Sequence, residues 1–256
     1  MSPEKFAFFI AVGVFTSGVM GLVLGHLLPE KYTTGPARDM IGAVVGLLTL
    51  LSALVLGLLI WTAYGVYAGQ NMAVQTLAAK VLQLDMALAD YGPGASKVRQ
   101  ALKESTRKSI DQIWHADLSD KQFIAKNFAG ALRNIKARDG ALAHLNPTTD
   151  DERTALASAT ATLESIGQSR LQMTFALANP VAVPVVLTVV GWMSLLFLGY
   201  GITSKGNPTS ILAAIIGALA VASGFYMILD LSSPYSGAFK PSAAPLEQVL
   251  DVIGKE

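Results

Sequence analysis

Few side chains in this sequence are of the types that carry out chemistry. There is no cysteine, which excludes disulfides, thiolate nucleophiles and cysteine metal ligands. The three histidines, His26, His115 and His144, are scattered, and the sequence contains no HExxH, GxSxG or P-loop motif. The sequence therefore gives no reason to expect an enzyme, a metal site or a cofactor. The remaining candidates are carboxylates and hydroxyls that lie in or beside apolar runs.

One such carboxylate, Asp230, lies at the end of the last long apolar run, and Ser-Ser-Pro-Tyr-Ser-Gly begins two residues later. If the run is a helix, Asp230 lies at the negative end of the helix dipole, where a carboxylate is unfavourable. Two interpretations are open. Asp230 is either an interfacial acid in water, or it pairs with a base such as Arg170 or Lys240. An ion pair would join the apolar run to the polar part of the chain and offset the dipole.

Small and hydroxyl side chains line one side of a second apolar run, which starts near Met40. The small stripe consists of Gly42, Gly46, Thr49, Ala53 and Gly57. Two roles suit such a helix: it packs centrally against the chain's other helices, or it lines a pore in which ions are selected by dehydration. For a pore, the predicted lining residues are Thr49, Ser52, Leu56 and Leu59.

The elements that must position these residues are long and apolar. The chain has 256 residues, of which 52% are hydrophobic and 14% charged, whereas soluble domains carry about 25% charged residues. No Asp, Glu, Lys or Arg occurs in residues 6–29, 40–79, 171–204 and 206–229. Each stretch exceeds the roughly 20 residues that a membrane span requires. The predicted fold is all-α and polytopic, with transmembrane helices at about 6–28, from 40 onward, 180–203 and 210–231.

A polar block separates the second and third spans, because most of the charged residues lie between residues 80 and 170. No proline occurs from Ala37 to Gly92, so the second helix is predicted to continue beyond the membrane to about Asp90. Its outer half has apolar residues at a/d spacing: Val74, Leu77, Val81, Leu84, Leu88 and Tyr91. Packing against the chain's own helices is predicted for this seam, with a coiled coil as the alternative.

Further helices are predicted over 95–114, 119–138 and 151–178, and a short amphipathic helix after Pro245. The predicted organisation is spans 1 and 2 in 1–70, a cytoplasmic helical domain in 71–178, spans 3 and 4 in 179–233, and a tail in 234–256. Four spans place both termini and the 71–178 domain on one side. That side carries all Lys and Arg except Lys31, Arg38 and Lys205, so the positive-inside rule favours the cytoplasm.

Two of the spans also carry small residues at four-residue spacing, which lets another helix approach closely. In the first span these are Gly13, Ser17, Gly21 and Gly25, and in the fourth they are Ala213, Gly217, Ala220 and Gly224. We predict helix packing at both faces, within or between subunits. The formal net charge of +1 gives no electrostatic support for nucleic-acid binding, so the expected partner is the lipid bilayer.

Several motifs resemble the bestrophin-like family of prokaryotic and plant membrane proteins. In the tail they are Asp230, Pro234, Tyr235, Ser236, Gly237, Ser242, Pro245 and Leu246. After the second span they are Leu84, Asp85, Leu88, Tyr91, Gly92 and Pro93. The stretches SIDQIWHAD and WMSLL also fit, so the resemblance extends in order over nearly the whole chain.

This resemblance implies an integral membrane protein related to bestrophin anion channels, which are pentamers with a pore-lining second span. The chain departs from animal bestrophins in two ways: its tail has no dense acidic calcium-binding cluster, and residues 48–60 lack an aromatic neck. The resulting hypothesis is a homo-oligomeric channel of the cytoplasmic membrane that conducts small inorganic ions, specifically anions, and lines its pore with the second span. Structural or gating contacts are predicted at Asp85, Tyr91, Arg170 and Asp230. The alternative is a membrane-anchored scaffold or sensor whose cytoplasmic helices bind a partner.

Overall fold

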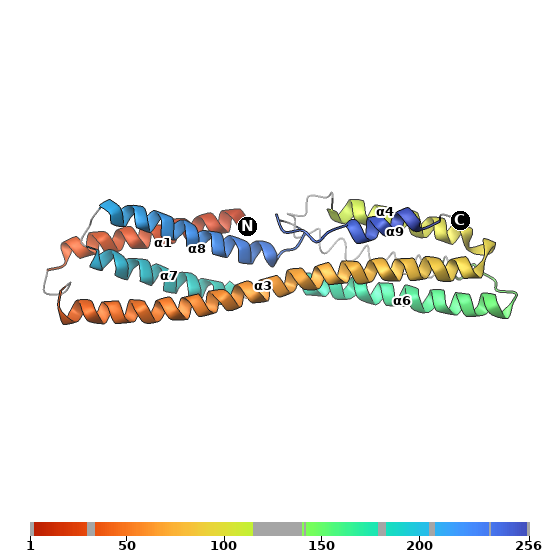
Figure 1. Cartoon of the computed structure of the whole chain (residues 1–256), viewed down its shortest axis with the longest axis horizontal. Coiled ribbons are helices and arrows are strands. Elements are labelled where there is room, and N and C mark those ends of the chain that lie inside the picture. Colours follow the sequence, from red (N-terminus) through yellow and green to blue (C-terminus); the bar gives the residue numbers. More distant parts are fainter. Residues whose placement is uncertain are drawn as a thin grey trace. The chain divides into compact units, whose positions relative to one another are not determined.

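The computed structural model describes residues 3–29, 34–114, 140, 142–178, 183–204, 208–235 and 237–254. The regular structure in these residues is helical: α1 (Pro3–Leu27), α3 (Pro36–Tyr91), η1 (Pro93–Ala95), α4 (Ser96–Trp114), α6 (Asp150–Ala178), α7 (Val183–Thr203), α8 (Pro208–Leu231) and α9 (Ala244–Val252) (Figure 1). The all-α prediction is confirmed for these residues. The helix predicted over 119–138 lies outside them.

Four of the described helices are long and apolar enough to span a membrane, namely α1, α3, α7 and α8. They coincide with the four uncharged stretches, so the four predicted spans are confirmed by length and composition. The chain divides into two compact units: unit 1 comprises 1–65 and 180–232, and unit 2 comprises 66–179 and 233–256. Helix α3 contributes its first half to unit 1 and its second half to unit 2.

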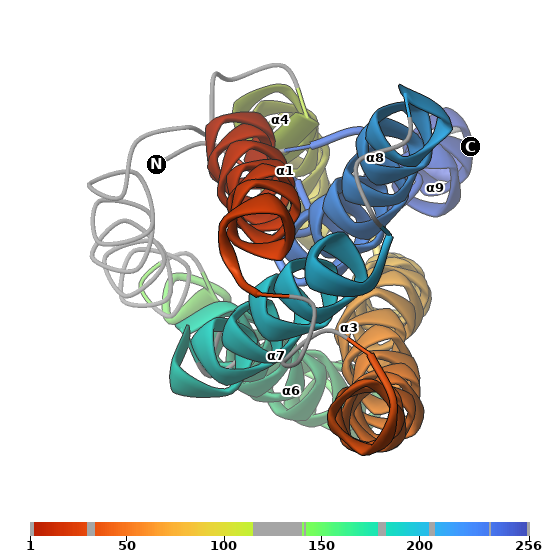
Figure 2. The ribbon, with the colours of Figure 1, turned by 90° about the vertical axis from the view of Figure 1, so that its left-hand side faces the viewer.

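In unit 1, α1 packs against α7 and α8 (Figure 2), and glycines permit the close approach of α1 to α7. A Cβ atom on Gly21 would overlap the backbone carbonyl of Leu198, and one on Gly25 would lie 2.7 Å from the carbonyl oxygen of Ile202. The approach is reciprocal, since a Cβ on Gly201 of α7 would overlap the backbone of α1. The predicted packing face of the first span therefore contacts the chain's own third span at these two glycines.

The other small residues of these faces are less closely packed. A Cβ on Gly13 would meet nothing within 4 Å. In α8, a Cβ on Gly217 would lie 2.7 Å from the Phe197 ring of α7, whereas Ala213 and Ala220 are exposed. Each face is thus packed within the chain along only part of its length.

Helix α3 runs without interruption for 56 residues, as the absence of proline predicted. Pro36 stands at its first position, where a missing N–H costs no hydrogen bond. It ends where Gly92 adopts a φ of +93°, a conformation that favours glycine. Only about 20 residues fit into the hydrocarbon core of a bilayer, so a large part of α3 extends beyond it.

Unit 2 has a hydrophobic core built around the second half of α3. The six residues of the predicted seam are all buried there: Val74, Leu77, Val81, Leu84, Leu88 and Tyr91. Residues of α4, α6 and α9 complete the core, which confirms packing against the chain's own helices. Helix α9 contributes Leu246 and Val249, and Ile253 follows directly after it. The Lys103 ammonium of α4 donates to the carbonyl oxygen of Ile253 at 2.8 Å.

A reciprocal cap begins α6. The carboxylate of Glu152 accepts a hydrogen bond from the Thr149 backbone N–H at 3.2 Å, and the Thr149 hydroxyl accepts one from the Glu152 N–H at 3.2 Å. Hydrogen bonds from Thr148 contribute most to lowering the pKa of the Glu152 carboxyl. The acids at the start of α6 therefore fix its first turn.

Candidate functional site

The membrane half of α3 has three faces that differ in burial and in side-chain size. The first face is buried within unit 1 and contains Val45, Ser52, Leu59 and Ala63. Ser52 and Leu59 are 0% and 7% exposed, and the Ser52 hydroxyl has no hydrogen-bond partner in the described structure. Leu56 is half-buried beside α8, with its Cδ2 atom 3.7 Å from the position of a Cβ on Gly224. This face joins α3 to the other spans.

The second face is the small stripe, which is exposed along its length. A Cβ atom on Gly42, Gly46 or Gly57 would meet nothing within 4 Å. Thr49 is exposed at the middle of the stripe and its hydroxyl donates to the Val45 carbonyl oxygen at 2.8 Å. At 100° per residue, the centre of the stripe lies roughly a quarter turn from the buried face. The described helices of unit 1 do not cover it.

The third face is exposed and bulky, and consists of Leu47, Leu50, Leu54, Leu58 and Trp61. Their exposed fractions lie between 58% and 73%. Large aliphatic side chains with a tryptophan toward the end of a span are typical of a surface in contact with lipid. Of the four predicted pore-lining residues, only Thr49 is exposed in the single chain, and the lining role of all four stays a prediction.

Asp85 and Arg99 form a two-pronged ion pair in unit 2. The guanidinium Nε donates to Asp85 Oδ1 at 2.8 Å, and a terminal nitrogen donates to Oδ2 at 2.9 Å. The two side chains are 6% and 18% exposed, respectively. The pair fixes α4 against α3 across the turn at Gly92. Sequence analysis selected Asp85 but missed its partner.

Tyr91 ends α3 and is buried in the core of unit 2. Its ring lies against the turn, since a Cβ on Gly94 would be 3.2 Å from Tyr91 Cε1. Burial raises the pKa of the Tyr91 phenol, and the negative charge of Glu152 raises it further. The environment of Tyr91 therefore keeps its phenol neutral and makes it a packing residue.

Asp230 is 1% exposed, one residue before the end of α8. This burial contradicts the interpretation of Asp230 as an acid in interfacial water. Arg170 is half-buried on α6, and its backbone carbonyl accepts a hydrogen bond from Thr174 at 2.9 Å. Their pairing stays a prediction, as do the gating roles of Asp85, Tyr91, Arg170 and Asp230.

A polar cluster that sequence analysis missed lies where the chain re-enters unit 2 after α8. The Tyr235 hydroxyl donates to Gln70 Oε1 at 3.3 Å, and Gln70 Nε2 donates to the Met173 carbonyl oxygen at 3.2 Å. The Tyr235 ring packs edge-to-face on Trp114, with 5.7 Å between centroids. The indole N–H of Trp114 donates to the Pro241 carbonyl oxygen at 2.7 Å. In the sequence, the cluster could have been suspected from Gln70, a polar residue toward the end of a long apolar run.

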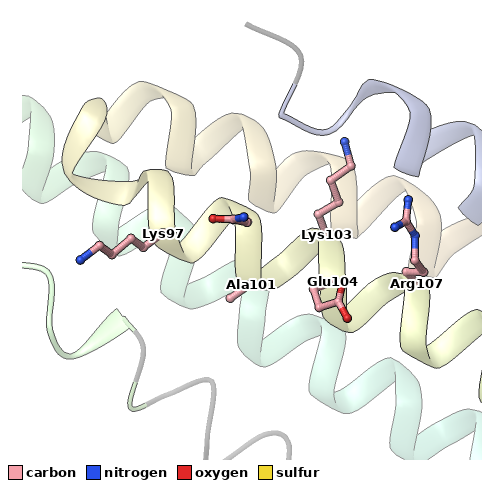
Figure 3. Close-up of a pocket in the computed structure, with 6 residues that line it drawn as sticks. Lys97, Ala101, Lys103, Glu104 and Arg107 are labelled. Atoms are coloured by element: carbon pink, nitrogen blue, oxygen red, sulfur yellow. The ribbon is translucent and has the colours of Figure 1, made fainter.

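A hollow on α4 is lined by Lys97, Gln100, Ala101, Lys103, Glu104 and Arg107 among the described residues (Figure 3). Its volume of about 590 Å³ is in the range of ligand sites. The lining side chains diverge, however: Lys103 and Arg107 point one way and Glu104 the other (Figure 3). In the described part of the chain no three His, Cys, Asp or Glu residues lie together as metal ligands would. The α3 faces are therefore the leading candidate site.

Four apolar helices and a bulky exposed face define a helical membrane protein in contact with lipid. A family model described as a bestrophin-like domain matches residues 8–246, and the chain belongs to this family. The resemblance drawn from Asp230 to Leu246 and from Leu84 to Pro93 is thereby confirmed at the level of the family. Searches of curated proteins and of solved structures gave no significant match.

Proposed function

We propose that the chain forms a homo-oligomeric ion channel of the cytoplasmic membrane, conducts small inorganic anions, and lines the pore with α3. Both termini and unit 2 lie on the cytoplasmic side. The observation that carries this proposal is the small stripe of α3, which is exposed although α3 buries a different face within unit 1. A narrow, uncharged face with one hydroxyl suits a pore in which ions pass a hydrophobic constriction.

More than one copy is required, because one stripe cannot enclose a path. Copies arranged about an axis would place equivalent stripes around it, with Thr49 contributing a ring of hydroxyls and the bulky face turned to lipid.

One positive side chain in the long uncharged part of α3 supports the choice of anions over cations. Lys80 is the only charged residue between Met40 and Leu84. Its ammonium donates to neutral oxygens, the Ser169 hydroxyl at 2.7 Å and the Ser165 carbonyl at 3.3 Å. No carboxylate of the described residues lies within ion-pair distance of it. The positive charge of Lys80 is therefore not neutralised by an ion pair and makes the potential around unit 2 more positive.

The deciding experiment measures ion flux in liposomes that contain the purified chain, with the reversal potential read in a planar bilayer. A current that reverses near the chloride equilibrium potential is expected. Thr49→Trp should abolish it, because the indole fills the axis. Leu54→Trp is the matched control and should conduct normally, since Leu54 belongs to the bulky face and is 69% exposed.

Two outcomes would count against the proposal. Equal conductance in the Thr49 and Leu54 variants would remove the small stripe from the pore. Absence of current from protein that is assembled would favour a membrane-anchored scaffold, for which unit 2 offers the partner surface. Ser52→Trp is a poor test, because Ser52 is fully buried and a large side chain there disrupts packing.

A further inference from the structure

The chain passes between unit 1 and unit 2 three times: after Gly65, before Pro180 and after Ser232. Close to each crossing, one residue of unit 2 belongs to the same hydrogen-bonded cluster. These residues are Gln70 of α3, Met173 of α6 and Tyr235 after α8. The single side-chain amide of Gln70 joins all three, because it donates to Met173 and accepts from Tyr235.

The hydrogen bond between Tyr235 and Gln70 is buried. Gln70 and Tyr235 are 2% and 6% exposed, so a hydrogen bond lost here is not replaced by one to solvent. Burial raises the pKa of the Tyr235 phenol well above its ordinary value. The phenol therefore stays protonated at physiological pH and continues to donate.

The backbone of Tyr235 is in a conformation that a tyrosine rarely adopts. Its φ is +90°, and it is the only non-glycine residue with a positive φ in the described part of the chain. A Cβ-bearing residue is strained there, and such strain persists only where the surroundings hold the residue in place. Two contacts do so: the hydroxyl on Gln70 and the ring on Trp114.

Trp114 also holds the chain beyond Tyr235. Its indole N–H donates to Pro241, while its ring receives Tyr235 edge-to-face. The chain that follows α8 is thus held at Tyr235 by α3 and α4, and again at Pro241 by α4. If the Tyr235 hydroxyl is released, the strain favours relaxation of the backbone toward negative φ, which swings the ring away from Gln70.

We propose that Tyr235 is a conformational latch with two states. In the closed state, its left-handed backbone holds the phenol on Gln70 and keeps the three crossings of unit 2 together. In the open state, its backbone relaxes and the phenol leaves Gln70, so that the chain after α8 is no longer joined to α3, while the bond from Gln70 to Met173 of α6 remains. One hydrogen bond within unit 2 then controls how the chain after α8 is held. The latch does not depend on which solute the protein conducts.

Distance measurement between two spin labels tests the latch directly, and the cysteine-free chain makes the labelling clean. Cysteines introduced at Lys240, on the chain after α8, and at Glu164, on α6, replace exposed residues of unit 2. The labelled full-length protein is expected to show one dominant distance. Tyr235→Phe keeps the ring and removes the hydroxyl. In the parent protein, the second distance should account for less than about 10% of the molecules. In the Tyr235→Phe protein, we expect most molecules to show it.

Gln70→Leu removes the acceptor and should produce the same second distance. Tyr200→Phe is the matched control, since Tyr200 is 55% exposed and lies on α7, and it should leave the parent distribution unchanged. The latch is overturned if both latch variants retain the single parent distance. It is also overturned if they give one broad distribution with a lowered thermal midpoint, which indicates a structural bond alone. The measurement requires no ion flux, so its result is independent of the proposed channel.

Discussion

At the scale of single residues, the ion pair between Asp85 and Arg99 differs from the surface pairs of the chain. Its carboxylate is 6% exposed, whereas Lys108 and Glu104 are 67% and 55% exposed. Buried charges cost much more to leave unpaired than surface charges do. The pair is therefore expected to determine the stability of unit 2.

Asp85→Asn should destabilise unit 2, because the Arg99 guanidinium loses its counterion. Removing one partner of a buried pair costs roughly 3–5 kcal/mol, and the partial exposure of Arg99 places the expected loss at the lower end. Glu104→Gln, the control in the exposed pair, should change stability by less than about 0.5 kcal/mol. Unfolding followed by circular dichroism in detergent measures both. Equal midpoints for the two variants would contradict the role of the pair.

Sequence alone could select Asp85 but not Arg99, because the pairing depends on the turn that folds α4 back along α3. The environment of Asp230 could not be predicted either. Its place at the end of an apolar run allowed two environments, and only the tertiary structure shows that it is buried. Tyr235 was recognised as part of a family motif. Its positive φ and its bond to Gln70 arise from tertiary contacts, which no local pattern encodes.

At the scale of elements, the contact between α1 and α7 depends on glycines that have no space for a side chain. Gly21→Ala places a Cβ against the Leu198 carbonyl, and overpacking of this kind costs roughly 1–3 kcal/mol. Gly13→Ala, on the same helix, meets open space and should be neutral or stabilising by up to about 1 kcal/mol. Thermal midpoints in detergent compare the two. A Gly21→Ala protein as stable as the Gly13→Ala protein would show that α1 and α7 separate easily.

The helices themselves were largely predictable. The lengths of the uncharged stretches predicted the four spans, and the absence of proline predicted the length of α3. The a/d spacing of apolar residues predicted how α3 packs within unit 2. The faces of α3 were harder to assign, because the small stripe and the row containing Ser52 lie side by side on the helix and both suit close packing. Burial separates them: the row containing Ser52 joins the subunit and the stripe remains exposed.

At the scale of the whole molecule, neither unit is a continuous piece of sequence. Unit 2 takes its core from residues 66–179 together with α9 in the tail. The predicted domain of 71–178 therefore lacks part of the core of unit 2. A binding assay for a partner of unit 2 should use the full chain rather than this fragment.

A chain that ends at Ser242 should fold less stably, because Leu246, Val249 and Ile253 no longer cover the core. Each buried apolar side chain contributes about 1.5–3 kcal/mol, so the thermal midpoint should fall clearly and binding of a hydrophobic dye should rise. Val252→Ala is the control, since Val252 is 59% exposed on the same helix. A truncated chain with the midpoint of the full chain would show that α9 docks only weakly.

The interleaving of the two units also determines the order in which they can be completed during protein synthesis. The ribosome delivers the first two spans, then most of unit 2, then the last two spans, and α9 after them. Helix α1 cannot complete its packing until α7 and α8 have been synthesised. The core formed by α3, α4 and α6 stays partly uncovered until α9 has been synthesised. Both units therefore close only after the elements that follow α6 have been synthesised, and a premature stop codon before the codons of α9 would leave the second unit unfinished.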